Sequence, residues 1–180
     1  QSNGVGATIK HFALNNQETN RMANDARVDE QTARELYLKG FEIAVRESQP
    51  WAVMTSYNKI NGTYAPENER LIENILREER GFEGMVMTDW GGGRDAVATV
   101  KAGNDLIMPG SANQIQAITD AVRNGTLSQE TIDRNVARVL AFIERSPKMQ
   151  GYQFMNDPDL TAHAKVSRSS ATEGMVLLKN

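Results

Sequence analysis

The chain has 180 residues, enough for one domain with a hydrophobic core, and its hydrophobic (39%) and charged (24%) fractions are those of an ordinary globular protein. A net charge of −3 without a basic run argues against nucleic-acid binding, and no apolar segment is long enough to cross a membrane. The chain has no cysteine, which excludes disulfides, and its two histidines are too few for an ordinary zinc site, so we expect no metal and no cofactor.

Apolar residues alternate between strand-like and helix-like patterns along most of the chain. Strands are predicted over residues 5–14, 51–57, 85–87 and 105–108. Helices are predicted over residues 30–48, 67–80, 94–102 and 113–123, with a further helix from Ser128 whose buried stripe is Ile132, Val136, Val139, Leu140 and Ile143. The Asn-rich residues 15–29 are predicted to form a long loop in which Glu18 and Arg21 pair with each other.

A strand, a loop and a helix, repeated four times, predict an α/β fold with a parallel sheet and right-handed crossovers. Four such units are half of an eightfold barrel, and an open doubly wound sheet remains an alternative. Residues 147–171 are typical of a linker that contains a last helix from Asp159 to about Thr172, and a strand is predicted at Met175–Leu178. His163 is interpreted as a surface residue of that linker. The start at Gln1 without a methionine suggests a piece of a longer protein, so the cellular location stays open.

The apolar run Met85–Met87 changes character at Thr88-Asp89-Trp90, just before three consecutive glycines. Parallel α/β folds keep their chemistry at the carboxyl ends of their strands. Asp89 is therefore a candidate catalytic carboxylate. The alternative is that Asp89 only caps the next helix.

Four motifs occur in order at the ends of successive predicted strands. They are Lys10-His11-Phe12, Met54-Thr55-Ser56-Tyr57-Asn58, Met87-Thr88-Asp89-Trp90 and Ala102-Gly103-Asn104-Asp105-Leu106-Ile107-Met108-Pro109-Gly110. Together they resemble glycoside hydrolase family 3, of the β-glucosidase type, over roughly residues 1–145, and residues 173–180 are similar to the opening of that family's second domain. The resemblance implies the C-terminal half of a TIM-type (β/α)8 barrel (1–146), a linker (147–171) and the first strand of an α/β sandwich domain (172–180).

The resemblance also implies roles for particular residues. Asp89 would be the nucleophile of a retaining, exo-acting β-glycosidase that releases terminal β-D-glucosyl residues through a covalent glycosyl-enzyme. The substrate-binding residues would be Lys10 and His11 on sugar hydroxyls, Met54 and Tyr57 lining the same subsite, and Trp90 on the aglycone side. The loop Ala13–Glu18 lacks the histidine of the family's N-acetylglucosaminidase branch, so a glutamate beyond Asn180 is expected as the acid/base.

These residue types suit the chemistry. A retaining glycosidase needs a carboxylate at the anomeric carbon and an acid at the leaving oxygen, about 5–5.5 Å apart. A lysine and an imidazolium nearby would keep Asp89 ionised. The alternative interpretations are a salt-bridged strand end for Lys10-His11 and core packing for Trp90.

Two other functions stay open. One is a barrel lyase or aldolase with a Schiff base on Lys10, which leaves Tyr57 and Asp89 unexplained. The other is a non-catalytic carbohydrate-binding or scaffold piece. The expected partners are a small carbohydrate substrate, such as a β-glucoside or an oligosaccharide, and the remainder of the same protein, but neither nucleic acid nor membrane.

Overall fold

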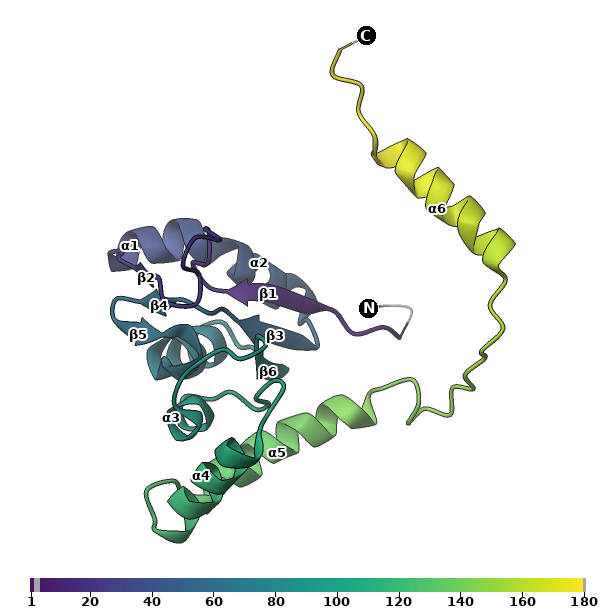
Figure 1. Ribbon diagram of the computed structural model, residues 1–180. Coiled ribbons are helices and arrows are strands. Elements are labelled where there is room, and N and C mark those ends of the chain that lie inside the picture. The colour runs from purple at the N-terminus through teal and green to yellow at the C-terminus, as the bar shows by residue number, and fades with distance from the viewer. Residues whose placement is uncertain (2–3, 180) are drawn as a thin grey trace. The chain divides into compact units, whose positions relative to one another are not determined.

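The computed structural model describes residues 1 and 4–179, and these divide into two compact units, Gln1–Gln150 and Gly151–Asn180. The first unit holds two small sheets and five of the α-helices labelled in Figure 1. The second unit contains the helix α6. The predicted domain boundaries at residues 146 and 171 remain a prediction; the two compact units meet between Gln150 and Gly151.

The main sheet is parallel, as the sequence predicts. Its strands are β1 (Thr8–Phe12), β3 (Ala52–Thr55) and β6 (Met85–Thr88), in the order β1-β3-β6. The fourth predicted strand, at residues 105–108, is reduced to a single parallel bridge between Met87 and Leu106. The side chains of Val53 and Val86 are completely buried, as expected for central residues of a parallel sheet.

A second, smaller sheet follows the order β2-β4-β5, with β2 at Asp25–Ala26, β4 at Lys59–Ile60 and β5 at Thr63–Tyr64. β4 and β5 form an antiparallel hairpin across Asn61-Gly62, where both residues have positive φ, 49° and 96°. Asn-Gly is suited to such a turn because both residues tolerate the left-handed region. The predicted loop over residues 15–29 thus contains one short strand, β2.

The helices lie close to their predicted ranges. They are α1 (Glu30–Thr32), the π-helical η1 (Ala33–Tyr37), α2 (Lys39–Ser48), the 3-10 helix η2 (Ala65–Glu67), the π-helical η3 (Arg70–Glu79), α3 (Ala96–Lys101), α4 (Ala112–Arg123) and α5 (Gln129–Glu144). Side chains of Asp29, Asp95, Ser111 and Ser128 accept hydrogen bonds from the first turns of α1, α3, α4 and α5. Asp95 caps α3, so Asp89 is free of that role.

The core of the first unit lies between the main sheet and its helices. Phe12 of β1 contacts Phe41 of α2 edge to face, with ring centroids 4.9 Å apart, and Figure 1 shows α2 running beside β1. Ile72 and Leu76 of η3 are fully buried in the same cluster. A second cluster, of Val100, Ala121 and Leu127, joins α3 to α4.

A buried ion network ties η3 and α5 to the segment after α3. The side chain of Asp105 is completely buried, and its Oδ2 accepts from Arg77 Nη2 at 2.7 Å and from Val86 N at 2.8 Å. Arg138 of α5 lies 3.3 Å from Asp105 Oδ1 and 3.4 Å from Glu73 Oε1. Each buried charge is thus paired, which is the condition for burying it at all.

The predicted buried stripe of α5 is wrong in part. Val136, Leu140 and Ile143 are 48%, 53% and 44% exposed, whereas Ile132 and Val139 are half-buried. The helix is amphipathic, but only the side that meets α3 and β6 is covered by the rest of the unit. Periodicity predicts which side of a helix is apolar and says nothing about what covers it.

The second unit confirms one prediction and corrects another. α6 spans Leu160–Gly174, two residues beyond the predicted end, and His163 on it is exposed. Met175–Leu178, predicted as a strand, adopts no regular structure, because a strand needs hydrogen bonds from a neighbouring strand. Asn180, part of the same predicted segment, lies outside the described residues. Over those residues, no helix combines the length and the apolar character that spanning a membrane requires.

Candidate active site

The carboxyl ends of the three parallel strands meet at one edge of the main sheet, and candidate residues lie on each of them. His11 lies within β1, Tyr57 comes two residues after β3, and Asp89 directly follows β6. Because the strands are parallel and adjacent, these side chains come together although they are far apart in the sequence. The structure therefore confirms the shared edge that the strand pattern predicts.

Asp89 is held at the end of β6 by contacts to neighbouring strands. Its Oδ2 lies 3.3 Å from His11 Nε2, with the two side chains 14% and 34% exposed. Its backbone N donates to Thr55 O at 3.2 Å, and its Oδ1 accepts from Trp90 N at 2.7 Å. One carboxylate oxygen is thus fixed by the backbone, while the other faces an imidazole.

Tyr57 is buried beside Asp89. Burial is the main cause that raises the pKa of the Tyr57 phenol above its ordinary value, and the neighbouring Asp89 carboxylate raises that pKa further. The positive charge of Arg21 lowers the pKa of the same phenol, but this effect is the smallest of the named causes. The phenol therefore keeps its proton at neutral pH and can donate it in a hydrogen bond to a carboxylate or to a bound oxygen.

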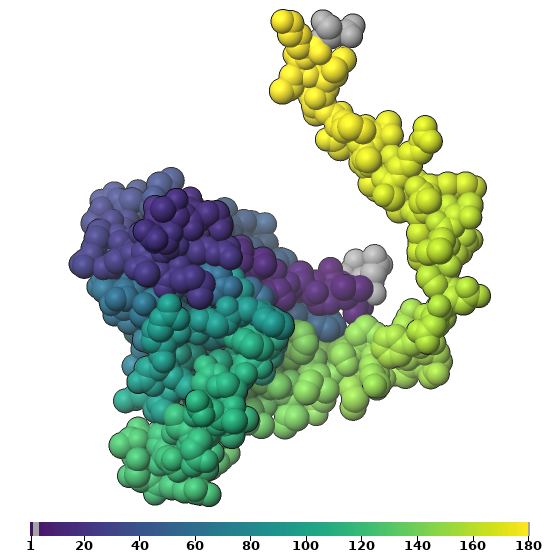
Figure 2. All heavy atoms as spheres, in the orientation of Figure 1, coloured from purple at the N-terminus to yellow at the C-terminus, as the bar shows by residue number. Residues whose placement is uncertain are grey.

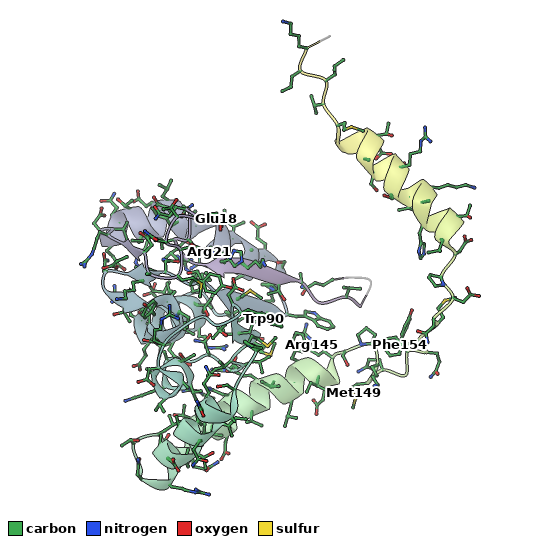
Figure 3. All side chains as sticks on the ribbon, viewed as in Figure 1. Glu18, Arg21, Trp90, Arg145, Met149 and Phe154 are labelled. Carbon is green, nitrogen blue, oxygen red and sulfur yellow. The ribbon has the colours of Figure 1, made fainter. Side chains whose placement is uncertain are left out.

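The structure adds one residue that the sequence interpretation left outside the site. Arg21 forms the predicted ion pair with Glu18, with Nη1 and Oε2 2.9 Å apart, but its guanidinium also lies over the Tyr57 ring, 5.2 Å from the centroid. Figure 3 shows both side chains on the loop that follows β1. A signal was available, since an arginine in a long polar loop after a candidate strand end is a functional candidate.

Buried hydroxyls and amides fix the strand ends beneath these residues. Ser56 Oγ donates to Ala13 O at 2.8 Å, and Asn58 Nδ2 donates to the same carbonyl at 3.2 Å, which joins β3 to the end of β1. Thr88 Oγ1 accepts from Met108 N at 2.9 Å, which joins β6 to the next segment. Buried side chains that bond to backbone groups in this way restrain the ends of the strands.

The remaining predicted site residues lie nearby in different settings. Met54 is half-buried in β3 and pairs in register with Met87. Lys10 is exposed and forms no ion pair with Asp89 in the part of the chain that the structure describes. Trp90 is 63% exposed on the glycine loop, so the alternative that it packs in the core is wrong. Figure 3 labels this side chain.

Among the described residues, no cluster of three or more His, Cys, Asp or Glu side chains could hold a metal ion. A hollow of about 580 Å³ lies between the loop after β1 and α1, lined by residues such as Asn24 and Thr32, and contains none of the candidate residues. We assign the site by its chemistry, because a carboxylate, an imidazole, a phenol and a guanidinium converge around Asp89 and Tyr57.

Comparison with known proteins identifies a family. A model described as the Glycosyl hydrolase family 3 N terminal domain matches residues 1–142. Beta-glucosidase B of Emericella nidulans is 44% identical over 187 residues, and thermostable beta-glucosidase B of Acetivibrio thermocellus is 45% identical over 183 residues. An exo-alpha-(1->6)-L-arabinopyranosidase of Bifidobacterium longum is 41% identical. Each alignment covers 100% of this chain and only 22–24% of the relative.

Solved structures agree in fold. Beta-glucosidase 3B from Thermotoga neapolitana, in complex with glucose, superposes with a TM-score of 0.92 at 51% identity, covering 99% of this chain and 26% of that one. A beta-glucosidase from Bifidobacterium adolescentis has a TM-score of 0.90 at 40% identity, covering 100% and 26%. The chain thus spans about a quarter of the length of these proteins.

Proposed function

Because this chain belongs to glycosyl hydrolase family 3, we propose that it carries the nucleophile of a retaining, exo-acting β-glucosidase that hydrolyses terminal β-D-glucosyl residues. The observation that carries the proposal is the position of Asp89. Its carboxylate follows a buried parallel strand, lies 3.3 Å from His11, and borders the phenol of Tyr57. The domain is proposed to be the second half of a (β/α)8 barrel.

In the proposed mechanism, Asp89 Oδ2 attacks the anomeric carbon and forms a covalent glycosyl-enzyme with inverted configuration, while the leaving-group oxygen is protonated. Water then attacks the same carbon, and the second inversion restores the β configuration. The Asp89 Oδ1–Trp90 N hydrogen bond presents the attacking oxygen in a fixed direction. The guanidinium of Arg21 places a positive charge over the Tyr57 ring, next to the carboxylate's phenol neighbour.

The other residues of the edge are proposed to bind the sugar. His11 and Lys10 donate hydrogen bonds to hydroxyls, Tyr57 donates from its protonated phenol, and Met54 contributes an apolar surface. Trp90, exposed on the glycine loop, offers an aromatic face to the aglycone.

The general acid is proposed to come from a segment outside this chain, joined to it in the complete protein. A retaining enzyme needs that acid about 5–5.5 Å from the nucleophile. Glu18 belongs to the loop after β1, but its side chain is 82% exposed and engaged by Arg21. If Glu18→Gln in the complete protein abolished turnover and added azide restored it, the acid would have to be reassigned to Glu18.

The nucleophile is tested by trapping. The complete protein is treated with 2-deoxy-2-fluoro-β-glucosyl fluoride, digested with trypsin, and analysed by tandem mass spectrometry. The label is expected on Asp89 in the peptide from Gly81 to Arg94, and Glu83 in the same peptide serves as the internal control carboxylate. A label on Glu83 or on another peptide, or an α-configured first product by NMR, would overturn the assignment.

Two alternatives are tested in the same preparation. The arabinopyranosidase relative makes an aryl α-L-arabinopyranoside the second substrate to assay beside the aryl β-glucoside. The Schiff-base alternative is weakened because Lys10 is exposed, whereas Schiff-base lysines are activated by desolvation. Borohydride trapping of a carbonyl substrate on Lys10 would revive it.

A further inference from the structure

One arginine joins the two loops that flank the candidate nucleophile. Arg94 follows the glycines after β6, and its Nη2 donates to the carbonyl of Met22, in the loop after β1, at 3.2 Å. We infer that Arg94 is a positioning residue that holds the loop of residues 15–24 so that Arg21 stays over the Tyr57 ring. This inference rests on the proposed function, because it names a determinant of the same site.

Arg94 is itself held in place from two sides. Its guanidinium lies over the Tyr64 ring, 5.4 Å from the centroid, and its backbone N donates to Glu67 Oε1. The same Glu67 oxygen accepts from Asp95 N at 2.9 Å. A carboxylate that accepts two consecutive backbone amides fixes the local path of the chain. The arginine therefore projects from a backbone whose direction is set before its side chain makes any contact.

The glycine that precedes Arg94 is part of this arrangement. Gly93 has φ of +77°, and a Cβ there would come within 2.9 Å of Thr99 Oγ1 and 3.4 Å of Glu67 Oε1. The loop can approach Thr99 this closely only because Gly93 has no side chain. The glycines thus let the chain turn between Trp90 and the start of α3. The Arg94 side chain then reaches the loop of residues 15–24.

The contact at Met22 can control Arg21 because the loop is internally braced. Arg21 N donates to Glu18 O at 3.2 Å, and the amides of Ala23 and Asn24 both donate to Asn20 O at 2.8 Å. Met22 lies between these bonds, directly after Arg21. A tether at the Met22 carbonyl consequently restricts the backbone that carries the Arg21 guanidinium, which lies 5.2 Å from the Tyr57 ring centroid.

The contacts of Arg94 also leave the ion pair between Arg21 and Glu18 intact. Arg94 satisfies a backbone carbonyl and an aromatic ring, and it needs no carboxylate from the site, so Glu18 remains free to pair with Arg21. In this arrangement Arg94 acts on the reaction through Arg21 and touches neither Asp89 nor the sugar. Its removal is expected to loosen the loop without removing any group that contacts the substrate.

The first test measures the loop itself. Amide hydrogen exchange of the complete protein, followed by mass spectrometry of peptides covering residues 15–24, is compared for wild type and Arg94→Ala. Exchange in this segment is expected to become about tenfold faster or more, because a bond from a charged donor is lost. Arg123→Ala is the matched control, since Arg123 pairs with Asp120 on its own helix. Unchanged exchange in Arg94→Ala would overturn the inference.

The second test is a double-mutant cycle on kcat/KM with an aryl β-glucoside. Arg94→Ala alone is expected to lower kcat/KM about tenfold, and Arg94→Lys by less, because lysine keeps the charge without the planar donors. In an Arg21→Ala background, the same Arg94→Ala change is expected to alter kcat/KM less than about twofold. A full additive loss in that background, or wild-type kinetics for Arg94→Ala, would contradict the inference.

The two proposals fail in different ways. If the wild-type complete protein hydrolyses neither glycoside, the proposed function is wrong, while the exchange measurement still decides whether Arg94 holds the loop. If the wild type is active and the exchange of residues 15–24 is indifferent to Arg94, the positioning role is wrong and the proposed function stands.

Discussion

At the scale of single residues, the site depends on how three strand ends surround one carboxylate. Asp89 is fixed by Thr55 O and by Trp90 N, and His11 faces its other oxygen at 3.3 Å. Ser56 and Asn58 anchor the end of β1 through the carbonyl of Ala13. Changes at this scale should therefore alter the chemistry more than the fold.

The first prediction concerns the nucleophile. Asp89→Asn keeps the shape of the side chain and removes its charge, so kcat should fall by several orders of magnitude while substrate still binds. The measurement is steady-state kinetics together with calorimetric binding of glucose to the complete protein. Substantial residual turnover in the variant would show that another group attacks the anomeric carbon.

The second prediction concerns Lys10 and His11. Replacing either by alanine should lower kcat/KM about ten- to a hundredfold, the loss expected for one charge-assisted hydrogen bond of about 1.5–3 kcal/mol. Lys101→Ala, at an exposed lysine at the end of α3, is the control and should leave the kinetics unchanged. If both site variants behaved like that control, the pair would be structural.

The third prediction uses the pKa of Tyr57, which burial and the Asp89 carboxylate raise. The unfolded chain releases this proton near pH 10, before the folded protein does, so the stabilisation is complete below about pH 10 and is lost as the pH rises through the raised pKa. Tyr57→Phe lacks this titration. The difference in unfolding free energy between wild type and variant should therefore shift against the wild type above pH 10, as measured by denaturant titration. Parallel pH profiles would contradict it.

At the scale of elements, buried ionic contacts decide how the helices sit on the sheet. Asp105 joins β6, η3 and α5 through Val86 N, Arg77 and Arg138. Burial lowers the pKa of the Arg77 guanidinium, and the Asp105 charge opposes that change. The contacts hold the strand that ends at Asp89.

The fourth prediction tests this network. Asp105→Asn leaves the buried charge of Arg77 without its carboxylate, so it should destabilise the protein by about 3–5 kcal/mol. Asp120→Asn removes a surface partner of Arg123 and should cost less than about 1 kcal/mol. Thermal unfolding of the two variants in the complete protein compares them directly. Equal midpoints for both variants would mean that the Asp105 network contributes little.

At the scale of the whole molecule, the chain spans 22–24% of its curated relatives, and its first unit leaves apolar side chains uncovered. Val136, Leu140 and Ile143 are exposed on α5, and Figure 2 shows this helix, in light green, at the surface of the unit. The sheet order also leaves β1 at an edge of the described sheet. Exposed edges and apolar patches favour association.

The fifth prediction follows from the proposal that the general acid comes from a segment outside this chain. The isolated 180-residue chain should be inactive on aryl β-glucosides and prone to aggregation, whereas the complete protein should be active. Assays of the purified chain, checked by light scattering, provide the measurement. Robust turnover by the monodisperse chain would require a general acid within it, with Glu18 as the first residue to mutate.

The sequence by itself determined the parts of this protein that depend on neighbouring residues. Apolar runs predicted β1, β3 and β6, and Asp89 was placed at the same edge as His11 and Tyr57 because parallel strands end on one side. Helix ranges followed from periodicity. The helix predicted from Ser128 is α5, and the Ser128 side chain caps its first turn. These predictions rest on local patterns. They hold in the structure because each depends on contacts within one element or between adjacent strands.

Only the tertiary structure decided which distant loops contact each other and which apolar side chains are left exposed. Arg94 meets the Met22 carbonyl 72 residues away, and Arg21 lies over Tyr57, because the paths of two irregular loops bring them together. Within the described residues, the predicted strand at Met175–Leu178 pairs with no other strand, and Val136, Leu140 and Ile143 on the outer side of α5 stay exposed. Local pattern describes what a segment can bury or pair, whereas the arrangement of the rest of the molecule determines whether it does so.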